Sequence, residues 1–485
     1  MGVTLPKPEG QQQDVVFLRA SGHCVALGAA GSGKTVMAVN RARYLSEAPG
    51  IGGPTLLVTY NGTLVTYLSS RIGREFDVDV LQYHLFAKKC IEERTHKKLQ
   101  VCDTVERHKL IEQALTEIRE GALWRHSTLN RSVKFFVDEF DWLDGHGVTD
   151  FGAYLSGELQ RTGRGSSLAV ADRAVPLRVY ERYRELRAAA GYDQDWPGIA
   201  GELRRCLAVD DEPPPYRHVV IDEGQDFSPE MIRSLVAAVP EEGSVTFFGD
   251  YAQQIYGRRL SWQSLGLQVK GGRTVRFDRN YRNTREIARL ATTMADMPHF
   301  ADGVELVRAG EPAHTGMTPT LVRVRSKDAQ LAEAMKYAKN VLYDRRTRAA
   351  SRRVAVLTRT PEFNDKFFMA LTKALESRKK APPVVRLHKG IRHWIDDPGF
   401  YVGQYVDARG LEFDTVIMPL CDEDELPPAE EIEALGSAEA RARQARELYV
   451  GITRARTELV ILYSGALTPL LPAPDSGMYE LLDDA

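Results

Sequence analysis

Short runs of apolar residues, each followed by a longer stretch of mixed polarity, recur along most of this chain. Such runs are typical of strands buried on both faces of a parallel sheet. Their alternation with longer, helix-compatible stretches predicts an α/β fold. The predicted strands are residues 24–27, 55–60, 218–221, 244–248 and 274–277 in the first half, and residues 354–358, 401–406, 415–418 and 459–462 in the second.

The pattern changes between residues 83 and 207, which are mainly helical in character and charged, without a clear strand. Residues 177–190 are one predicted helix of this region. We therefore expect a helical insert within the first of two parallel-sheet domains. The predicted division is residues 1–82 with 208–275 for the first domain, 83–207 for the insert, and 276–485 for the second domain.

Two segments leave alternatives open. The basic, glycine-containing segment 161–165 suits either contacts to phosphates or a plain surface loop. The acidic, Pro- and Ala-rich stretch 421–440 predicts a mobile surface loop or a short helix rather than a site.

Composition narrows the class of protein without identifying it. A formal charge of −2 does not single out a nucleic-acid binder, but a local basic groove can bind phosphates on a near-neutral protein. No apolar run is long enough to span a membrane, and the N-terminus lacks the apolar core of a signal peptide. The five cysteines include no Cys-x-x-Cys pair, which favours the cytoplasm and argues against zinc or iron–sulfur sites.

Residues 28–35, Gly-Ala-Ala-Gly-Ser-Gly-Lys-Thr, match the complete pattern of a phosphate-binding loop. A predicted strand enters this loop, and residues 36–39 begin a helix that leaves it. Glycines let backbone N–H groups turn toward a phosphate, and a helix N-terminus favours negative charge. A glycine-rich turn that binds nothing would not need this context. The candidate nucleotide contacts are Gly28, Gly31, Ser32, Gly33, Lys34, which would reach the β- and γ-phosphates, and Thr35, which would bind Mg²⁺.

Acidic and polar residues follow two of the predicted strands. Asp222 and Glu223 come directly after residues 218–221, and a polar cluster at 249–256 follows residues 244–248. The carboxyl ends of parallel strands form the ligand-binding edge of such sheets. One carboxylate there could hold Mg²⁺ and the next polarise an attacking water. An exposed acidic turn is the alternative.

Six motifs in this order resemble those of superfamily 1 helicases of the UvrD/Rep/PcrA type, over nearly the whole chain. The resemblance implies two RecA-like domains, ATP and Mg²⁺ as cofactors, and ATP-dependent 3′-to-5′ movement on single-stranded or tailed duplex DNA. The motifs are the loop at 28–35, Asp-Glu at 222–223, Gly-Asp-x-x-Gln at 249–253, Asn-Tyr-Arg at 280–282, Gly-Leu-Glu-Phe at 410–413 and Val-Gly-x-Thr-Arg-Ala at 450–455.

The resemblance also implies roles for residues around the nucleotide. Gln12 would read the adenine, although Gln11 or Gln13 could take that place, because an amide offers both a donor and an acceptor. Tyr281 would stack on the adenine and Glu412 would contact the ribose.

For hydrolysis, the resemblance implies that Asp222 binds Mg²⁺ and that Glu223 is the catalytic base. Gln253 would link the γ-phosphate to the DNA site. Arg282 and Arg454 would be arginine fingers, and Arg454 would come from the second domain.

Contacts to single-stranded DNA are implied at two places. One is the strand end at Thr59, Tyr60 and Asn61. The other lies near Tyr256, where Arg258 stands in place of a common base-stacking tryptophan. Arg258 or the nearby Trp262 could stack there instead.

The compact build resembles short UvrD-like proteins, including the helicase-like subunit of two-protein phage-defence systems of the Gabija type. Too few residues separate Arg282 from Tyr401 for the full accessory domain that full-length relatives insert there, so we expect this domain to be absent or reduced to a few helices. A partner nuclease is therefore a further expectation. The alternative to an autonomous helicase is a nucleotide-gated, DNA-sensing subunit that regulates such a nuclease.

Overall fold

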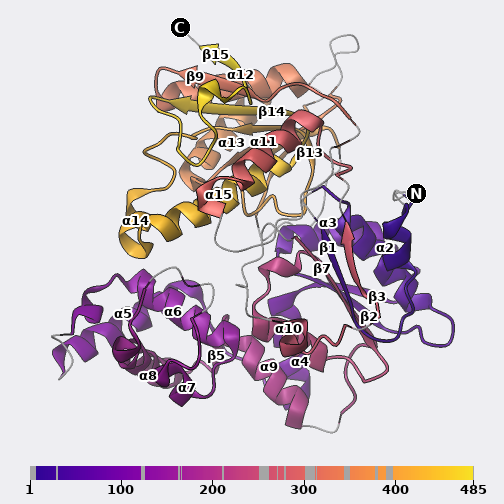
Figure 1. The fold of residues 1–485 in the computed structure, drawn as a ribbon, viewed down its shortest axis with the longest axis vertical. Helices are drawn as coiled ribbons and strands as arrows, with labels where there is room; N and C mark the ends of the chain where they lie inside the picture. The colour runs from indigo at the N-terminus through magenta and orange to yellow at the C-terminus, as the bar shows by residue number, and fades with distance from the viewer. Residues whose placement is uncertain are drawn as a thin grey trace.

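The chain folds around two parallel sheets, with a separate helical lobe beside the first (Figure 1). The predicted α/β class is confirmed. Among the described residues, no helix combines the length and apolar character needed to cross a membrane. This computed structural model describes residues 7–28, 31–121, 126–161, 164, 167–209, 212–250, 261–269, 271–277, 280–300, 312, 314–342, 350–376, 381–388 and 397–483.

The first sheet has the strand order β3-β2-β6-β7-β1-β8. Its four central strands are buried along their whole length, as the uninterrupted apolar runs predicted. The edge strand β3 was not predicted, because polar residues interrupt its sequence and no residue of it is fully buried. The strands are β1 Cys24–Gly28, β2 Thr55–Thr59, β3 Val78–Gln82, β6 His218–Ile221, β7 Ser244–Gly249 and β8 Thr274–Phe277.

The second sheet has the strand order β11-β12-β10-β13-β14-β9-β15. All four strands predicted in this half are present, although the one predicted at 401–406 runs from Gly399 to Gln404. The three strands missed have only short apolar runs and lie at or next to an edge. The strands are β9 Thr320–Val324, β10 Arg353–Thr358, β11 Val384–Arg386, β12 Gly399–Gln404, β13 Phe413–Met418, β14 Ala455–Ser464 and β15 Glu480–Asp483.

Helices pack against both sheets and form the connections between their strands (Figure 1). The stretch 421–440 contains one short helix, α14, and the first turn of a longer one, α15. The described residues between Arg282 and Tyr401 belong to the second sheet and its helices. The absence or reduction of the accessory domain stays a prediction. The helices are α1 Gln11–Val16, α2 Lys34–Glu47, α3 Gly62–Ile72, α4 Tyr83–Thr95, α9 Ile199–Val209, α10 Pro229–Ala237, α11 Arg285–Ala295, α12 Lys327–Leu342, α13 Pro361–Leu375, α14 Ala429–Leu435 and α15 Ser437–Thr453.

The helical lobe has an apolar core of its own, in which Phe136, Phe140 and Tyr183 are fully buried. In contrast, α4 and α9, at the two ends of the predicted insert, bury their apolar faces against the first sheet. The predicted domain boundaries stay a proposal. The elements of the lobe are β4 Val101–Cys102, α5 Thr104–Glu120, α6 Val133–His146, α7 Phe151–Ser156, α8 Ala174–Ala189 and β5 Gln194–Asp195.

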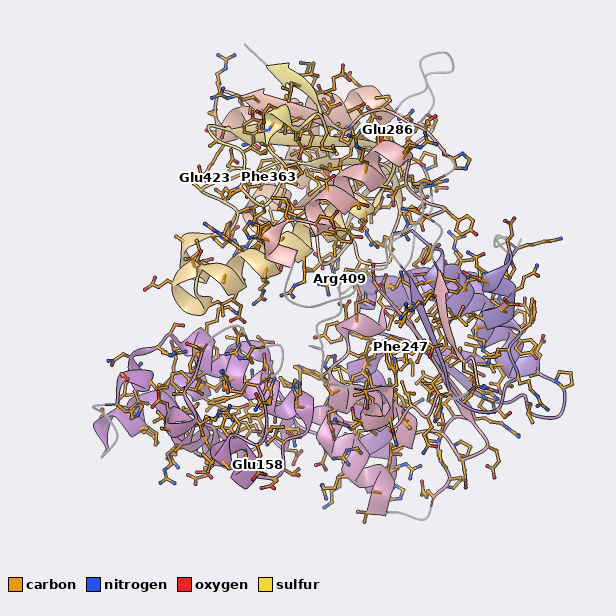
Figure 2. All side chains as sticks on the ribbon, in the orientation of Figure 1. Glu158, Phe247, Glu286, Phe363, Arg409 and Glu423 are labelled. Carbon is orange, nitrogen blue, oxygen red and sulfur yellow. The ribbon has the colours of Figure 1, made fainter. Side chains whose placement is uncertain are left out.

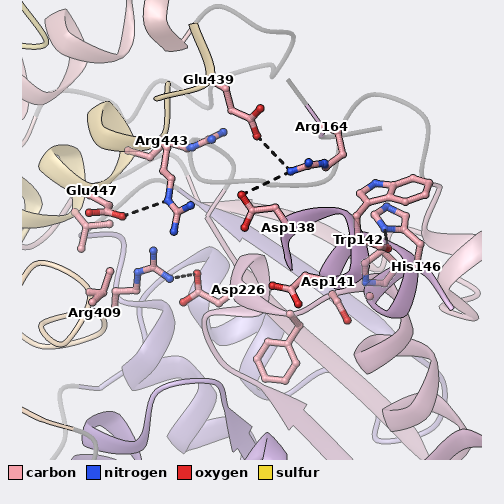
Figure 3. A pocket seen from close by; sticks show the side chains of 17 residues that line it. Asp138, Asp141, Trp142, His146, Arg164, Asp226, Arg409, Glu439, Arg443 and Glu447 are labelled. Carbon is pink, nitrogen blue, oxygen red and sulfur yellow. Dashed lines mark hydrogen bonds and ion pairs between the residues drawn. The ribbon is translucent and has the colours of Figure 1, made fainter. Parts of the chain in front are cut away.

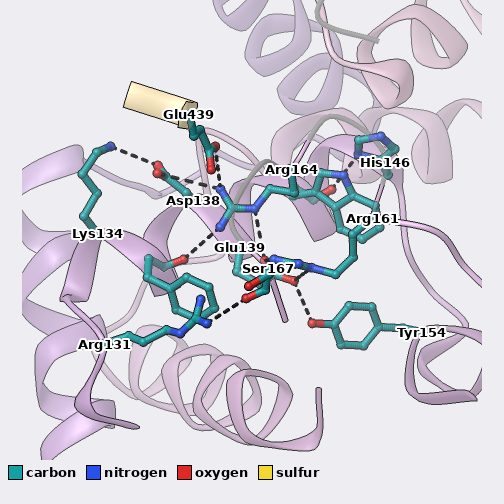
Figure 4. A network of polar contacts seen from close by, with 12 residues as sticks. Arg131, Lys134, Asp138, Glu139, His146, Tyr154, Arg161, Arg164, Ser167 and Glu439 are labelled. Carbon is teal, nitrogen blue, oxygen red and sulfur yellow. Dashed lines mark hydrogen bonds and ion pairs between the residues drawn. The ribbon is translucent and has the colours of Figure 1, made fainter. Parts of the chain in front are cut away.

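The basic segment at 161–165 supplies two arginines to a buried carboxylate (Figure 4). Glu139 of α6 is fully buried and accepts hydrogen bonds from Arg161 Nε at 2.8 Å, Arg164 Nε at 3.2 Å and Tyr154 Oη at 2.8 Å. Burial would raise the pKa of Glu139, but the two arginines hold it below its ordinary value. Both arginines therefore anchor the insert in this structure.

Arg41 of α2 is fully buried and fixes the N-terminal segment against the first sheet. Its guanidinium donates to the carbonyl oxygens of Val16, at 3.1 Å, and Leu18, and to Thr246 Oγ1 on β7 at 3.3 Å. Burial lowers the pKa of Arg41 to about 10, so the side chain stays charged at neutral pH. It thereby holds α1, which carries Gln12, beside the phosphate-binding loop.

We expect Arg41→Met to destabilise the protein, because the carbonyl groups of Val16 and Leu18 lose their donor. A buried polar group left without a partner costs about 1–3 kcal/mol. The denaturant midpoint, followed by circular dichroism, should fall. Arg19→Met, at an exposed position of the same segment, is the matched control, and equal effects of the two substitutions would contradict the anchoring role.

Candidate active site

The phosphate-binding loop joins β1 to α2, as predicted. Gly33 is the residue that precedes α2, with φ 83°, a left-handed conformation that glycine adopts without strain. Lys34 is buried, and its ammonium group donates to the Gly28 carbonyl oxygen at 2.8 Å. From α1, the amide of Gln12 donates to the Ser32 carbonyl oxygen at 3.2 Å. The Lys34 ammonium group and the Gln12 amide therefore both lie against the phosphate-binding loop.

Two carboxylates follow β6 at the same edge of the sheet. Asp222 is fully buried, and neither of its carboxylate oxygens has a hydrogen-bond partner among the described residues. Burial and the adjacent Glu223 charge raise the pKa of Asp222. The Thr35 hydroxyl faces Asp222 and offsets part of this rise in pKa, but it lies outside hydrogen-bonding geometry.

Glu223 has φ 52°, an uncommon backbone conformation for a residue with a side chain. Such strain concentrates at functional sites. Burial would raise the pKa of Glu223, but surrounding groups hold it below its ordinary value. In decreasing order of effect these groups are Arg454, Lys34, the hydrogen-bonding amide of Gln225, and Arg282.

Both predicted arginine fingers approach Glu223 from the side of the second sheet. Arg282 lies just before α11, and its guanidinium is 2.7 Å from the carboxylate of Glu412. Arg454 directly follows α15 and donates from Nε to the Val450 carbonyl oxygen at 3.0 Å. Burial and the neighbouring Arg282 charge lower the pKa of Arg454 to about 10. The two arginines are therefore held close together.

Asn280 was not singled out among the predicted site residues. It holds the segment that carries Arg282 against the phosphate-binding loop. Its side-chain oxygen accepts hydrogen bonds from the backbone N–H groups of Arg282 at 3.0 Å and Asn283 at 3.1 Å. The next residue, Tyr281, donates its backbone N–H to the Gly31 carbonyl oxygen at 2.9 Å. Tyr281 is 45% exposed, which leaves its ring available for stacking. Asn280 is the first residue of the Asn-Tyr-Arg motif, and this position could have identified it from the sequence.

The arrangement fits a magnesium nucleotide by its unsatisfied polar atoms. Buried atoms without a hydrogen-bond partner in the described part of the chain include Ser32 Oγ, both oxygens of Asp222, Arg282 Nε and Arg454 Nη1. Buried polar groups normally have partners. Oxygen ligands suit Mg²⁺, and guanidinium groups suit phosphate.

The residues predicted to contact DNA differ in how deeply they are buried. Tyr60 is half-buried beside the ring of Phe227, whereas Thr59 is fully buried. Asn61 directly precedes α3, and its side-chain amide donates to the Asp407 carbonyl oxygen at 3.3 Å, which links the first domain to the second.

Trp262 is half-buried and packs with its ring centroid 5.0 Å from that of Phe247. This contact gives Trp262 a packing role in the first domain, where Phe247 lies within the sheet (Figure 2). Gln253, Tyr256 and Arg258 lie outside the described residues. The predicted DNA contacts therefore stay predictions.

Two family models match this chain. Residues 11–259, just over half of the chain, match an AAA domain. Residues 407–466 match the UvrD-like helicase C-terminal domain. The chain belongs to the UvrD-like helicases. It is an ATP-hydrolysing DNA helicase, and the fold and the order of its motifs agree with that family.

Among solved structures, this helicase is similar to the C-terminal domain of a possible DNA helicase from Lactobacillus plantarum WCFS1. The match has 21% sequence identity and a TM-score of 0.26, and covers 41% of this chain and 98% of the other. No curated protein matches the chain.

We expect Gly31→Ala to abolish nucleotide binding, because Gly31 has φ 83° and an added Cβ would lie 2.3 Å from Asn280 Oδ1. Gly50→Ala is the matched control, since Gly50 has φ 78° but open space around it. Binding of a fluorescent ATP analogue should be lost only in the first variant. Equal binding by both variants would mean that the contact between the loop and Asn280 does not matter.

Proposed function

We propose that this helicase couples hydrolysis of Mg-ATP to 3′-to-5′ movement along single-stranded DNA. The observation that carries the proposal is the convergence of Lys34 from the first domain with Arg282 and Arg454 from the second on the carboxylate of Glu223. A nucleotide in this place would touch both domains. Its hydrolysis would therefore change how the domains hold each other.

In this proposal, the triphosphate binds between Lys34 and the two arginines. Thr35 and Asp222 would hold Mg²⁺, which supplies charge neutralisation at the phosphate oxygens. Glu223 would orient the attacking water, and its lowered pKa keeps it ionised as that role requires. The arginines would stabilise the charge that develops during phosphoryl transfer.

Movement follows if the strand lies across both domains. The contacts of Asn61 with the backbone at 406–409 join the end of β2, where we propose that DNA binds, to the second domain. Closing the nucleotide cleft would then shift one strand-holding surface relative to the other. Alternating affinities of these surfaces during the ATP cycle would produce directional steps.

The first test is steady-state ATP hydrolysis with and without single-stranded DNA. We expect DNA to stimulate the wild-type chain and Glu223→Gln to lose hydrolysis. An ATP hydrolysis rate that is the same with and without single-stranded DNA would contradict an autonomous helicase. It would favour a subunit that regulates a partner nuclease.

We expect Arg454→Ala to lower kcat by about a thousandfold or more, as loss of an arginine finger does elsewhere. Arg456→Ala is the matched control, because Arg456 lies two residues further on and pairs at the surface with Asp414 at 3.2 Å. The control should hydrolyse ATP at nearly the wild-type rate. A similar loss in both variants would argue against a specific role for Arg454.

Direction of movement is tested separately, with duplexes that carry a tail at either the 3′ or the 5′ end. We expect strand separation, or displacement of streptavidin from a biotinylated end, only when movement runs 3′ to 5′. The opposite preference would overturn the proposed polarity without affecting the hydrolysis site.

A further inference from the structure

Arg454 stands at the corner between a helix and a strand of the second domain. Thr453 is the last residue of α15, and Ala455 is the first residue of β14. The last carbonyl groups of a helix have no partner within that helix. Near this corner, Arg454 Nε and Thr453 Oγ1 both donate to the Val450 carbonyl oxygen at 3.0 Å. The Thr453 carbonyl group needs a donor from another part of the chain.

Asn283 supplies that donor from the segment before α11. Its side-chain amide donates to the carbonyl oxygens of Thr453 at 3.2 Å and Ala455 at 2.5 Å. Asn283 is buried, with 2% of its surface exposed. These two carbonyl groups flank Arg454. A single side chain therefore fixes the backbone on both sides of this arginine.

Thr453 in turn contacts both arginines of the site. Arg282 Nη1 donates to the Thr453 carbonyl oxygen at 3.5 Å, and Arg454 Nη2 donates to the Thr453 hydroxyl at 3.2 Å. Arg282 Nε and Arg454 Nη1 are buried and have no hydrogen-bond partner in the described part of the chain. Each guanidinium group thus keeps a donor for a phosphate oxygen. The position of Thr453 therefore affects both donors at once.

The Asn283 amide can take only one orientation here. Its Oδ1 accepts a hydrogen bond from Asn280 Nδ2 at 2.9 Å. A rotation that exchanged its nitrogen and oxygen would place an oxygen against the two carbonyl oxygens that it now binds. Asn280 and Asn283 also lie against the phosphate-binding loop, since a Cβ added to Gly31 would be 3.0 Å from Asn283 Oδ1. Asn283 therefore connects the loop to the corner that carries Arg454.

Other contacts between the two domains lie away from this corner. Arg409 Nη1 is 2.6 Å from Asp226 Oδ1 (Figure 3). Asn61 donates to the Asp407 carbonyl oxygen. Both contacts act on residues 406–409, which precede β13, rather than on the backbone beside Arg454. They hold the domains together at a different place.

We propose that Asn283 is a positioning residue for ATP hydrolysis. It holds the Thr453 peptide so that Arg282 and Arg454 face the nucleotide as one unit, and it ties this unit to the phosphate-binding loop. Asn283 acts through the two arginines and does not itself contact the phosphate. The inference rests on the proposed function, because it takes both arginines to act in hydrolysis.

The first test is the steady-state kinetics of Asn283→Leu, which keeps the approximate size of the side chain and removes its hydrogen bonds. We expect kcat to fall by about a hundredfold, since misplacing a catalytic group by about 1 Å can cost that much. Binding of a fluorescent ATP analogue should stay close to that of the wild type. An unchanged kcat, or a loss of binding that accounts for the whole effect, would overturn the proposal.

The second test repeats Asn283→Leu in the Arg454→Ala chain. Residues that act as one unit in catalysis have non-additive effects. The substitution should therefore lower kcat much less in this background than in the wild type. An equal fold-loss of kcat in both backgrounds would mean that Asn283 acts independently of Arg454, and would overturn the proposal.

The matched control is Gln330→Leu in the same domain. Gln330 of α12 is a fully buried amide that donates to Asp422 Oδ2 at 2.9 Å and accepts from the Leu420 backbone N–H at 2.7 Å. It also donates to Ser464 at the far end of β14 from Arg454. Gln330→Leu should lower the denaturant midpoint and leave kcat near the wild-type value.

Asn283→Ala covers the case in which Asn283→Leu does not fold. The smaller side chain leaves room for a water molecule to bind the two carbonyl groups. This variant should fold and still show a lower kcat with nearly normal binding of the ATP analogue. Failure of both variants to fold would overturn the proposal, because Asn283 would then be required for the fold itself.

The two proposals fail separately. If Arg454→Ala leaves kcat unchanged, the role of the arginines in the proposed function is wrong. If Arg454→Ala lowers kcat but Asn283→Leu and Asn283→Ala hydrolyse ATP like the wild type, only the positioning role of Asn283 is wrong.

Discussion

The structure depends on a concentration of charge between its two sheets. The neighbouring Arg282 disfavours the positive charge of Arg454, and Lys34 of the first domain acts on the same carboxylate as both arginines, that of Glu223. Within the chain, Glu412 and Glu223 compensate only part of this charge. A bound triphosphate would complete the compensation. The relative position of the two domains is therefore sensitive to what lies between them.

Hydrogen bonds and an ion pair connect the nucleotide cleft to other parts of the interface between the two domains. Asn280 fixes the Arg282 segment, while the side-chain amide of Asn283 donates to the Thr453 carbonyl oxygen at 3.2 Å. Both arginines consequently belong to one hydrogen-bonded unit of the second domain. At the predicted DNA contacts, Asn61 reaches the second domain, and nearby Arg409 pairs with Asp226 at 2.6 Å. The proposed nucleotide and strand sites are thus joined by the same interface.

The sequence predicted the elements whose signal is local. The buried strands could be predicted because each is a short, uninterrupted apolar run, and the loop at Gly28 to Thr35 because its complete motif lies within a few residues. The half-exposed β3 and the edge strand β15 were missed because their burial is incomplete and their apolar runs are short. Contacts between side chains that are far apart along the chain could not be predicted from the sequence either. Nothing near Arg164 in the sequence indicates that Glu139 and Glu439 hold it.

The central claim is that a nucleotide draws the two domains together through the arginines of the second. The most direct measurement is the distance between spin labels on Glu47→Cys of α2 and Lys373→Cys of α13, both exposed positions, with the native cysteines buried. Mg²⁺ with a non-hydrolysable ATP analogue should narrow and shift the distance distribution in the wild type. The shift should disappear in Arg454→Ala. A distribution that does not respond to nucleotide, or responds equally in both proteins, would contradict the claim.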